Sequence, residues 1–462
     1  MNHDRLPSFS IQAAATEARL RAGLVLHGVA AYSFAELAVH TGAVLRAWER
    51  FRAARHTEPT AEQTARDAYF LVAEPNLGTI AAIYAAFEIG ATCVLLHHRS
   101  TPAEQVAQLA LCSELEAGAG DVGARVVLFT SGSMGRSKGV VLPHTAFAAS
   151  ASASAANLGW RDDDRWLCCL PLAHVGGLSI LMRCLAARRT AVLDVGASFE
   201  PARIAACIEL ERITLVSLVP TMLARLLDIG WTPPAHLRAV LLGGAAASPT
   251  LLARAAERGV PVLATYGMTE TCAQISTQPY HTPPASDGRI GPPLPGAELR
   301  IHDGRIQARG PMLFERYLGA PTPIDEAGWF DTGDCGEIDA DGVLRVLGRA
   351  DDTIITGGEN VHPGEIEPAL IEHPAIAAAC VFGIDDETWG QIIGAAVRCR
   401  EQREPVALAE DLGRFLAARL PVHKRPRHLA VLPDLATGAT EKLDRQRIAQ
   451  AAAHQLIPVR YP

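Results

Sequence analysis

One stretch of the chain, residues 129–144, gathers hydroxyl side chains and glycines around a single lysine: FTSGSMGRSKGVVLPH. Backbone amides in a Gly-rich turn form an anion-binding concavity, and Ser and Thr hydroxyls add donors. The cation is Lys138, although 39 of the 42 basic residues are arginines and the other lysines are Lys424 and Lys442. Because a compact ammonium and a planar guanidinium are not interchangeable, we expect phosphate here. A plain Gly/Ser surface turn also fits this stretch, and its spacing is not that of a Walker loop.

Two carboxylates stand in settings that suggest chemistry. Glu270 is the one charged residue in LATYGMTETCAQIS, and acidic side chains in apolar surroundings are rarely unpaired. Asp334 ends GWFDTGD, and a carboxylate accepts hydrogen bonds from two vicinal donors at once. The alternatives are a solvated surface for Glu270 and a turn for Asp334.

The elements that must position these residues alternate between strands and helices. ITLVSLV (213–219) precedes PTMLARLLD, RAVLLGG (238–244) precedes SPTLLARAAERG, and VPVLATYG (260–267) follows. This alternation predicts an α/β fold with parallel sheets covered by helices. From about residue 286, short strands separated by Gly and Pro predict a small antiparallel or β-barrel portion.

A second change of pattern near residue 349 predicts a domain boundary. A charged link precedes a Gly-Gly turn, a helix begins near Pro363, and strands and helices then alternate to the end of the sequence. We therefore expect a large N-terminal domain over 1–348, a hinge over 349–352 and a small α+β C-terminal domain over 353–462.

The composition excludes several classes of protein. The 462 residues are 49% hydrophobic and 20% charged, as in soluble globular proteins, and the net charge of −8 argues against nonspecific nucleic-acid binding. Ten cysteines without CxxC or zinc-like spacing predict reduced thiols in a cytoplasm. The N-terminus shows no signal-peptide pattern. The most apolar segment, 77–96, contains Glu88 and Gly90, so we expect a buried helix and strand rather than a membrane span.

Five segments, in the right order, resemble the motifs of the adenylate-forming enzymes, which include acyl-CoA synthetases, peptide-synthetase adenylation domains and luciferases. They are FTSGSMGRSKGVVLPH, YGMTE (266–270), GWFDTGD (328–334), GRADDTIITGGENVHPGEIE (348–367) and the region of Lys442. The family's first motif reads TSGSTGxPKGV, so Met134 and Ser137 depart from it. Five ordered motifs are far more specific than one Gly-rich loop.

The resemblance implies a reaction in two halves that uses ATP, Mg²⁺ and coenzyme A. A carboxylate attacks the α-phosphate of ATP to give an acyl-adenylate and pyrophosphate, and a thiol then attacks the activated carbonyl and releases AMP. By resemblance Glu270 holds Mg²⁺, a hard cation that prefers carboxylate and phosphate oxygens, and Thr269 contacts the α-phosphate. The β- and γ-phosphates would be bound by Thr130, Ser131, Gly132, Ser133, Gly135 and Lys138.

The same resemblance implies the remaining nucleotide contacts. Asp334 would bind the ribose hydroxyls, with Arg349 in support. Adenine would lie between Tyr266 and the backbone of LLGGAAAS (241–248). The implied nucleotide-binding residues in these segments are Gly243, Gly244, Ala245, Tyr266 and Gly267.

In the C-terminal segment, Lys442 matches the lysine that reaches the α-phosphate and the acyl carboxylate during adenylation. The family usually places Gly directly before this lysine, whereas here Glu441 intervenes and the glycine is Gly438. A solvated lysine at a helix start is the alternative. Lys424 lies in a basic stretch and is expected to brace the second domain or to meet CoA phosphates.

For the thiol half-reaction, the family's C-terminal domain is mobile and rotates about a hinge aspartate, matched here by Asp351. Rotation would bring Gly357 and Gly358 to the pantetheine tunnel, where side chains would block the thiol. Trp389 is expected to contact CoA, or else to fill the core of the small domain.

The acyl pocket is implied by LPLAHVGGLSI (170–180), which places His174 at the family's gate position. A histidine with ordinary core partners is the alternative. Ala173 stands where an aromatic residue is usual, which implies a roomier pocket. The other predicted substrate-contacting residues are Gly176, Gly177, Arg183, Gly267 and Met268.

The acid remains open among three hypotheses. Short length and the strings SLVPTMLARLL, AVLLGGAAAS and PLAHVGGLS resemble o-succinylbenzoate–CoA ligases of menaquinone biosynthesis. For that acid, Arg183 would bind the carboxylate that does not react, unless it is a surface arginine. The second hypothesis is another aryl- or medium-chain acyl-CoA ligase. The third is a relative that binds nucleotide or acyl-adenylate without turnover. The sequence also leaves open whether the chain forms a homo-oligomer.

Overall fold

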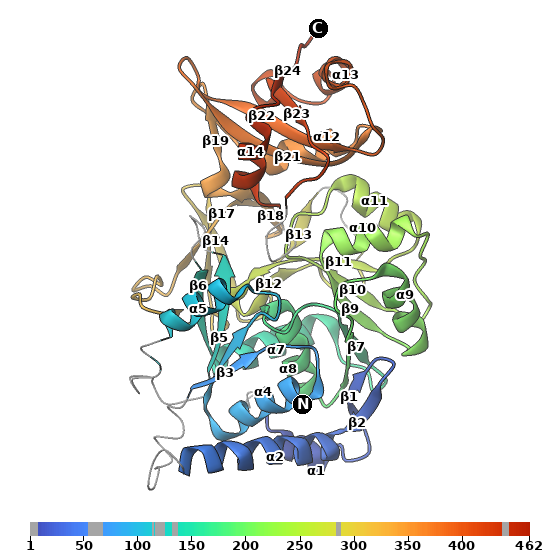
Figure 1. The fold of residues 1–462 in the computed structure, drawn as a ribbon, viewed down its shortest axis with the longest axis vertical. Coiled ribbons are helices and arrows are strands. Elements are labelled where there is room, and N and C mark those ends of the chain that lie inside the picture. Colours follow the sequence, from blue (N-terminus) through green and yellow to red (C-terminus); the bar gives the residue numbers. More distant parts are fainter. Residues whose placement is uncertain are drawn as a thin grey trace.

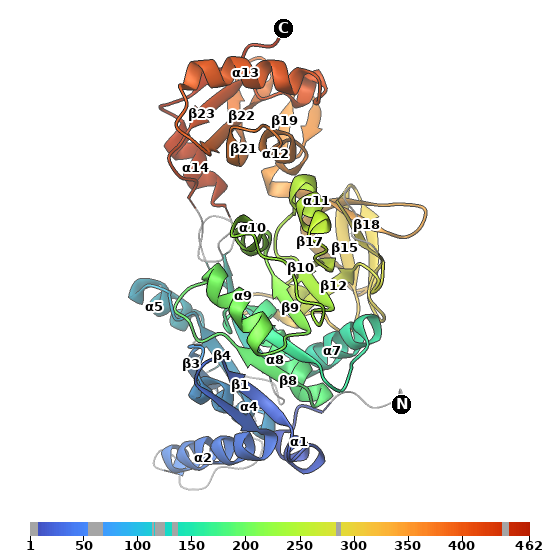
Figure 2. The same ribbon diagram turned by 90° about the vertical axis from the view of Figure 1, so that its right-hand side faces the viewer.

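The computed structural model describes residues 8–53, 68–112, 115, 125–131, 137–282, 288–436 and 443–462. Figure 1 shows two bodies, a large one that contains both helix-covered sheets and a smaller one near the C-terminus. Figure 2 shows the same arrangement from the side, with α11 (Pro249–Glu257) of the large body facing the smaller one.

The largest sheet in the described residues has the strand order β12-β11-β10-β9-β7-β8-β1-β2. The strands from β11 to β1 pair in parallel, and β12 and β2 close the two edges as antiparallel strands. The strands are β1 (Ala22–Leu26), β2 (Ala30–Ser33), β7 (Arg165–Cys168), β8 (Thr190–Leu193), β9 (Leu215–Leu218), β10 (Ala239–Leu242), β11 (Val262–Met268) and β12 (Ala273–Thr277).

A second sheet of the large body carries the predicted phosphate loop. Its order is β16-β6-β5-β4-β3, in which β3, β4 and β5 are parallel and β5–β6 and β6–β16 are antiparallel. The strands are β3 (Ala68–Val72), β4 (Thr92–Leu96), β5 (Arg125–Ser131), β6 (Ser137–Pro143) and β16 (Arg316–Tyr317). In parallel α/β sheets, ligands bind outside the carboxyl ends of the strands.

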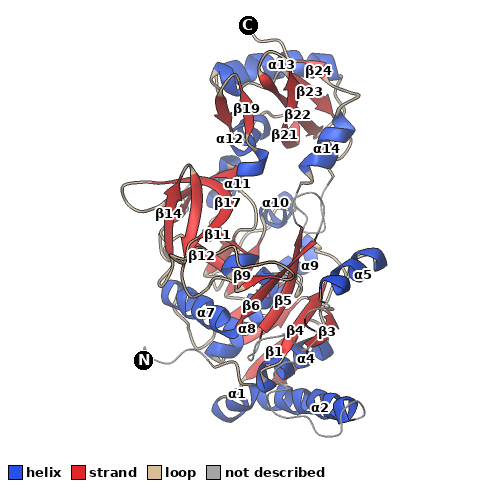
Figure 3. Cartoon of the chain, turned by 90° about the vertical axis from the view of Figure 1, so that its left-hand side faces the viewer, coloured by secondary structure: helices blue, strands red, loops and turns tan. Residues whose placement is uncertain are grey.

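Helices cover both sheets and fill the space between them, as the helix and strand colours of Figure 3 show. The helices α4, α7 and α8 supply much of the largest buried apolar cluster, which joins the two sheets. The helices α9, α10 and α11 pack in a second cluster on the largest sheet. The helices are α1 (Ile11–Glu17), α2 (Phe34–Ala53), α4 (Leu77–Ile89), α5 (Pro102–Leu111), α7 (His144–Leu158), α8 (Val175–Ala187), α9 (Pro201–Leu210), α10 (Pro220–Asp228) and α11.

Local residue types set the helix boundaries. Thr101 and Glu104 form a capping box at the start of α5, with Pro102 in the first turn. Asn76 caps α4, which ends at Gly90 in the left-handed conformation. The segment 77–96 is therefore a buried helix followed by β4, as predicted. None of the helices in the described residues is long and apolar enough to span a membrane.

The portion after residue 286 is an antiparallel sheet in the order β13-β18-β17-β15-β14. It carries Asp334 and Arg349 on paired strands, which brings these two predicted nucleotide residues side by side. The strands are β13 (Arg289–Gly291), β14 (Glu298–His302), β15 (Arg305–Arg309), β17 (Phe330–Ile338) and β18 (Leu344–Arg349).

The smaller body is an α+β unit whose sheet has the order β20-β19-β22-β23-β24, with β21 also paired to β22. Its two apolar clusters draw their members from residue 354 onward. The 3₁₀ helix η3 (Ala350–Asp352) precedes it. The elements are β19 (Ile354–Thr356), β20 (Glu359–Val361), α12 (Pro363–Ile371), β21 (Ile376–Asp386), β22 (Gly390–Cys399), α13 (Pro405–Ala417), β23 (His428–Val431), α14 (Arg445–Ala452) and β24 (Ile457–Pro458).

Candidate active site

The predicted phosphate loop lies between the paired strands β5 and β6. Thr130 pairs with Lys138 and Ser131 with Ser137, so the register holds the two ends of the loop together. The side chain of Lys138 is exposed. The predicted phosphate contacts Gly132, Ser133 and Gly135, together with the departure Met134, lie outside the described residues, so their roles stay predictions.

Glu270 lies in the short 3₁₀ helix η2 (Thr269–Thr271), which joins β11 to β12. Cys272 and Ala273 follow it with positive φ angles of 49° and 80°, which makes the reversal between the strands tight. A Cβ added to Gly267 would lie 1.8 Å from the carbonyl oxygen of Ala273. Gly267 is thus required by the close approach of the two strands, in addition to any ligand contact. Met268 caps the turn, its N–H donating to Thr271 Oγ1 at 2.9 Å.

Lys138 and Glu270 both contact the side chain of Tyr317. The ammonium of Lys138 lies 5.2 Å from the centroid of the Tyr317 ring, and the Tyr317 hydroxyl donates to Glu270 Oε1 at 2.9 Å. Mg²⁺ in nucleotide sites is usually held by one or two carboxylates plus phosphate oxygens. A carboxylate next to a lysine that is predicted to bind phosphate fits that donor set, so Glu270 would hold the metal ion here.

The predicted ribose residues form a small network in which Tyr266 and Asp334 are buried and Arg349 is exposed. Tyr266 donates from its hydroxyl to Asp334 Oδ2 at 2.7 Å, and Arg349 Nη1 lies 3.3 Å from Asp334 Oδ1. Burial and the Asp334 carboxylate raise the pKa of Tyr266 well above its usual value, so the phenol stays protonated and donates. Asp334 lies within strand β17 and not in a turn.

The segment expected to face adenine follows β10. A Cβ on Gly243 would lie 2.2 Å from Thr265 Oγ1, and Gly244 has a positive φ of 79°, so both positions favour glycine for backbone reasons. Gly244 and Ala245 are exposed. If adenine lies here as the motifs predict, the two glycines would place no side chain between the ring and the backbone.

The predicted gate residue His174 is the N-cap of α8, with its backbone starting the helix and its side chain making no cap hydrogen bond. A Cβ on Gly177 would lie 2.4 Å from the carbonyl oxygen of Pro171, so close packing at the helix start requires this glycine. The space at Gly176 is less tight, with Leu170 Cδ1 at 3.1 Å. His174 and both glycines therefore share one turn at the helix start.

Two histidines that the sequence analysis did not single out stand beside the gate. The rings of His97 and His98 stack at 4.8 Å, and the His97 ring lies 5.0 Å from that of His174. His97 follows directly on β4, the central parallel strand of the phosphate-loop sheet. The signal was LLHHRS, a histidine pair at the carboxyl end of a buried strand, where ligand sites form.

His97 is held in its neutral form. Its Nδ1 accepts the backbone N–H of Arg99 at 3.0 Å, which places the proton of the neutral ring on Nε2. Burial, with the adjacent His98 and Arg99, lowers the pKa of His97 to about 4. Its Nε2 is buried without a hydrogen-bond partner among the described residues.

This depressed pKa predicts a pH dependence of stability. The unfolded chain protonates His97 near pH 6.5 and the folded chain only near pH 4, so the free energy of unfolding should fall as pH drops between these values, by at most about 3 kcal/mol from this residue. Urea unfolding of wild type and His97→Asn at pH 7.5, 6, 5 and 4.5 measures the slope. His281→Asn, at the surface, controls for loss of an imidazole. Equal slopes in wild type and His97→Asn would contradict the assignment.

Arg183 lies in the interior of the molecule and not on the surface. It is 4% exposed, its Nη1 donates to Gln274 Oε1 at 2.7 Å, and its Nη2 donates to Ser150 Oγ at 3.2 Å. Gln274 pairs with Gly267 across β11 and β12, so the guanidinium lies behind the strand pair that carries YGMTE. Burial lowers the pKa of Arg183 to about 10.

At the predicted hinge, Asp351 is exposed and lies 3.9 Å from Arg349. The adjacent Asp352 pairs with Arg445 at 3.3 Å, and Arg445 also pairs with Glu367 of α12. Lys442 lies outside the described residues, so its role stays a prediction. Asp444, close after it, donates its N–H to the carbonyl of Ala436 at 2.9 Å, which brings the two flanks of this segment together.

Lys424 forms an ion pair within the smaller body, which agrees with the first of its two expected roles, bracing that body. Its ammonium donates to Glu365 Oε1 at 2.5 Å, and Glu365 also accepts the N–H of His362 at the start of α12. The ion pair with Lys424 lowers the pKa of Glu365 against the opposing effect of its burial.

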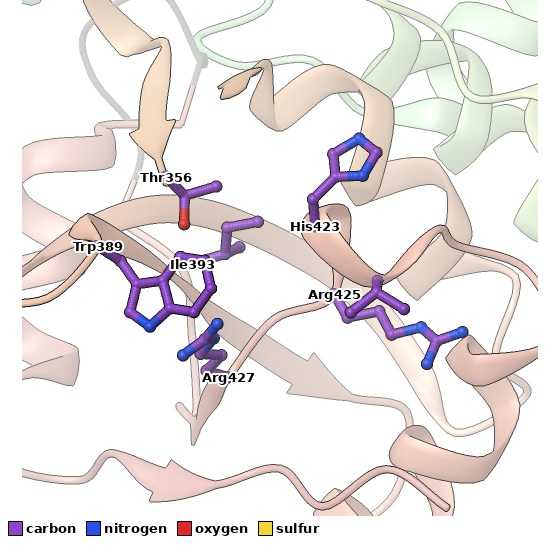
Figure 4. A pocket seen from close by; sticks show the side chains of 7 residues that line it. Thr356, Trp389, Ile393, His423, Arg425 and Arg427 are labelled. Carbon is purple, nitrogen blue, oxygen red and sulfur yellow. The ribbon is translucent and has the colours of Figure 1, made fainter. Parts of the chain in front are cut away.

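The smaller body also has a surface cavity of about 220 Å³, lined by Thr356, Trp389, Ile393, Val422, His423, Arg425 and Arg427. Trp389 is 43% exposed, so it is not a core residue, and the Arg427 guanidinium lies 4.4 Å from its ring centroid. Figure 4 shows the two side chains together, with His423 and Arg425 across the cavity.

Gly357, one of the two predicted tunnel glycines, lies against Trp389 of this cavity. A Cβ on Gly357 would lie 2.6 Å from the Trp389 ring, and Gly357 donates its N–H to the Trp389 carbonyl at 2.9 Å. Gly357 and Gly358 have positive φ angles of 60° and 86°. The turn therefore places bare backbone beside the indole.

Two protein-family models match the chain, and both describe AMP-binding enzymes. Residues 123–318 match the family model of AMP-binding enzymes, and residues 365–442 match that of the AMP-binding enzyme C-terminal domain. The chain belongs to this family of adenylate-forming enzymes, as its motifs predicted.

Within this family, the chain is similar to ligases and synthetases that are named for 2-succinylbenzoate. The 2-succinylbenzoate–CoA ligase of Bacillus mycoides strain KBAB4 is 39% identical over 342 residues, which are 70% of this chain and 69% of the relative. The o-succinylbenzoate CoA synthetase (MenE) of Bacillus subtilis in complex with the acyl-adenylate OSB-AMP superposes with a TM-score of 0.83 at 29% identity, covering 96% of this chain and 98% of that one. Its complex with ATP and magnesium gives 0.80 at 29% identity, covering 96% and 99%.

Proposed function

We propose that this chain is an AMP-forming acid–thiol ligase that joins 2-succinylbenzoate to coenzyme A for menaquinone biosynthesis. The similar ligases and synthetases above support both the reaction class and the acid. The single structural observation that carries the choice of a dicarboxylate is the environment of Arg183.

Arg183 is a buried cation without an anionic partner in the part of the chain that the structure describes. Its contacts among the described residues are the neutral Gln274 and Ser150 and the face of Trp166, whose ring centroid lies 5.7 Å away, and its Nε has no hydrogen-bond partner there. A buried charge is costly unless it is paired. The second carboxylate of 2-succinylbenzoate would supply the missing negative charge. A monocarboxylic acid would not, because its one carboxylate is used to form the acyl-adenylate.

The other residues divide between the two half-reactions. Lys138 would offset the negative charge of the triphosphate, and Thr130 and Ser131 would donate hydrogen bonds to it. Glu270 would hold Mg²⁺, which would supply further positive charge to the phosphate oxygens. Asp334, held by Tyr266 and Arg349, would accept the ribose hydroxyls. Lys442 would reach the α-phosphate from the smaller domain. We propose domains 1–348 and 353–462 with the hinge 349–352, because the apolar clusters draw their members from either side of that segment.

We assign coenzyme A to the cavity beside Gly357 and Gly358. Trp389→Ala removes the ring on which Arg427 lies, and should raise the KM for CoA about tenfold, from loss of roughly 1–2 kcal/mol of stacking. Pyrophosphate release without CoA should be unchanged. Steady-state kinetics with varied CoA measures the effect, and an equal loss in the CoA-independent step would refute the assignment.

Ten free cysteine thiols agree with a cytoplasmic location, which we include in the proposal.

The proposal is tested by supplying ATP, Mg²⁺ and CoA with a panel of acids: 2-succinylbenzoate, benzoate, 2-acetylbenzoate, succinate and octanoate. Mass spectrometry of the products should find AMP and a CoA thioester with 2-succinylbenzoate, at a kcat/KM at least about a hundredfold above the others, as one charge-assisted contact allows. Preference for a monocarboxylate would support another acyl- or aryl-CoA ligase. Nucleotide binding without any product would support a non-turnover relative.

A further inference from the structure

Tyr317 holds a position between the two charged residues of the triphosphate site. Its strand β16 pairs with β6 so that Tyr317 lies opposite Val140, two residues beyond Lys138. Backbone N–H groups of Glu315 and Leu318 donate to the carbonyls of Val141 and Gly139 at 2.9 and 2.8 Å. The segment is therefore an edge strand on the phosphate-loop hairpin.

The same segment is attached to η2. The N–H of Phe314 donates to the carbonyl of Glu270 at 2.8 Å, and the Tyr317 hydroxyl donates to Glu270 Oε1 at 2.9 Å. This hydrogen bond orients the carboxylate. Among the described residues, Glu270 Oε2 accepts no hydrogen bond.

The ring of Tyr317 also contacts Lys138, whose ammonium lies over the ring, 5.2 Å from its centroid. An ammonium at the face of an aromatic ring is attracted by roughly 0.5–1 kcal/mol at exposed sites. Within the described residues Lys138 forms no ion pair within 4.0 Å, with Glu270 or with any other carboxylate. A direct Lys138–Glu270 pair would neutralise both groups before ATP bound.

We propose that Tyr317 is a positioning residue that keeps Lys138 and Glu270 apart and oriented for the metal-bound triphosphate. The inference rests on the proposed function, because it takes the phosphate and metal roles of these two residues from it. Leu318 packs over Gly139, where a Cβ would lie 2.6 Å from Leu318 Cδ1, and Phe314 is 1% exposed. These two neighbours pack into the interior, whereas the Tyr317 hydroxyl is bonded to Glu270.

Tyr317→Phe removes only the hydroxyl, so the strand and the ring remain. With α,β-methylene-ATP as the nucleotide, Mn²⁺ binding followed by electron paramagnetic resonance should weaken about tenfold, as expected for loss of a hydrogen bond to a charged group. Nucleotide affinity without metal should stay within about twofold by calorimetry. Acyl-adenylate formation should fall about tenfold at limiting Mg²⁺ and recover at high Mg²⁺, while thioester formation from supplied acyl-adenylate is unchanged.

The matched control is Tyr461→Phe, which removes another partly buried phenol hydroxyl, bonded to the carbonyl of Pro426 at 2.8 Å in the smaller body. It should leave Mn²⁺ binding unchanged. Tyr317→Leu also removes the ring, and should weaken metal-free nucleotide binding through Lys138. Wild-type Mn²⁺ affinity in Tyr317→Phe, or equal losses in both half-reactions, would overturn the proposal. Failure of the wild type to activate any acid would refute the proposed function, while the metal-binding comparison would still test Tyr317.

Discussion

Replacing Lys442 with alanine should slow acyl-adenylate formation about 100- to 1,000-fold, which is the usual loss when one group that stabilises transition-state charge is removed. The same variant should convert supplied acyl-adenylate and CoA to thioester at a rate within about threefold of wild type, because the proposed role of Lys442 ends with the first half-reaction. Pyrophosphate release and single-turnover thioester formation measure the two steps separately.

Lys424→Ala is the control, because it removes the other lysine of the smaller body. Lys424 is paired with Glu365 at the start of α12, so its loss should lower stability and affect both half-reactions alike. Equal losses in both half-reactions of Lys442→Ala would contradict the role of that residue. Such a result would indicate that Lys442, like Lys424, acts on the stability of the smaller body and not on adenylation.

Arg183→Met should lower kcat/KM for 2-succinylbenzoate about a hundredfold while leaving that for benzoate within about threefold, since it removes a charge-assisted contact of roughly 2–3 kcal/mol to the second carboxylate. The melting temperature should hold or rise. An unpaired buried cation costs folding energy, and an apolar side chain of similar length does not. Kinetics with both acids and a thermal scan give the three values.

Arg238 provides the matched control for a buried guanidinium. Arg238 has a carboxylate partner, with Nη2 2.7 Å from the fully buried carboxylate of Asp164, whereas Arg183 has none within the described residues. Arg238→Met should therefore lower the melting temperature, because it leaves a buried carboxylate unpaired, and should not change the ratio of the two acids. A selectivity change in Arg238→Met equal to that in Arg183→Met would show that the effect is general and not a carboxylate contact.

Much of the fold followed from patterns that depend on local sequence. Apolar runs of four to seven residues followed by helices with Pro in the first turn, as at Pro220 and Pro249, gave the parallel strands and their crossovers. The helix expected near Pro363 begins there. Asp334 and Arg349, which the motifs placed at one ribose, are paired across β17 and β18.

The rest of the site depends on contacts between distant segments. Tyr317 lies 47 positions from Glu270, and its pairing with β6 joins two motifs that are separate in the sequence. His97 meets His174 only because two sheets pack against α8. For Gly177 and Gly267 the motifs gave the residue type, but the close backbone contacts that require it appear only in three dimensions. Side-chain partners of this kind leave no periodic signal along the chain.

Under the proposed function, a carboxylate of the acid attacks the α-phosphate of ATP in this site. The most direct test uses 2-succinylbenzoate labelled with ¹⁸O in both carboxylates, with ATP, Mg²⁺ and CoA, and mass spectrometry of the phosphate-containing products. We predict one ¹⁸O atom in AMP and none in pyrophosphate. Label in inorganic phosphate with release of ADP, or AMP without label, would contradict the account.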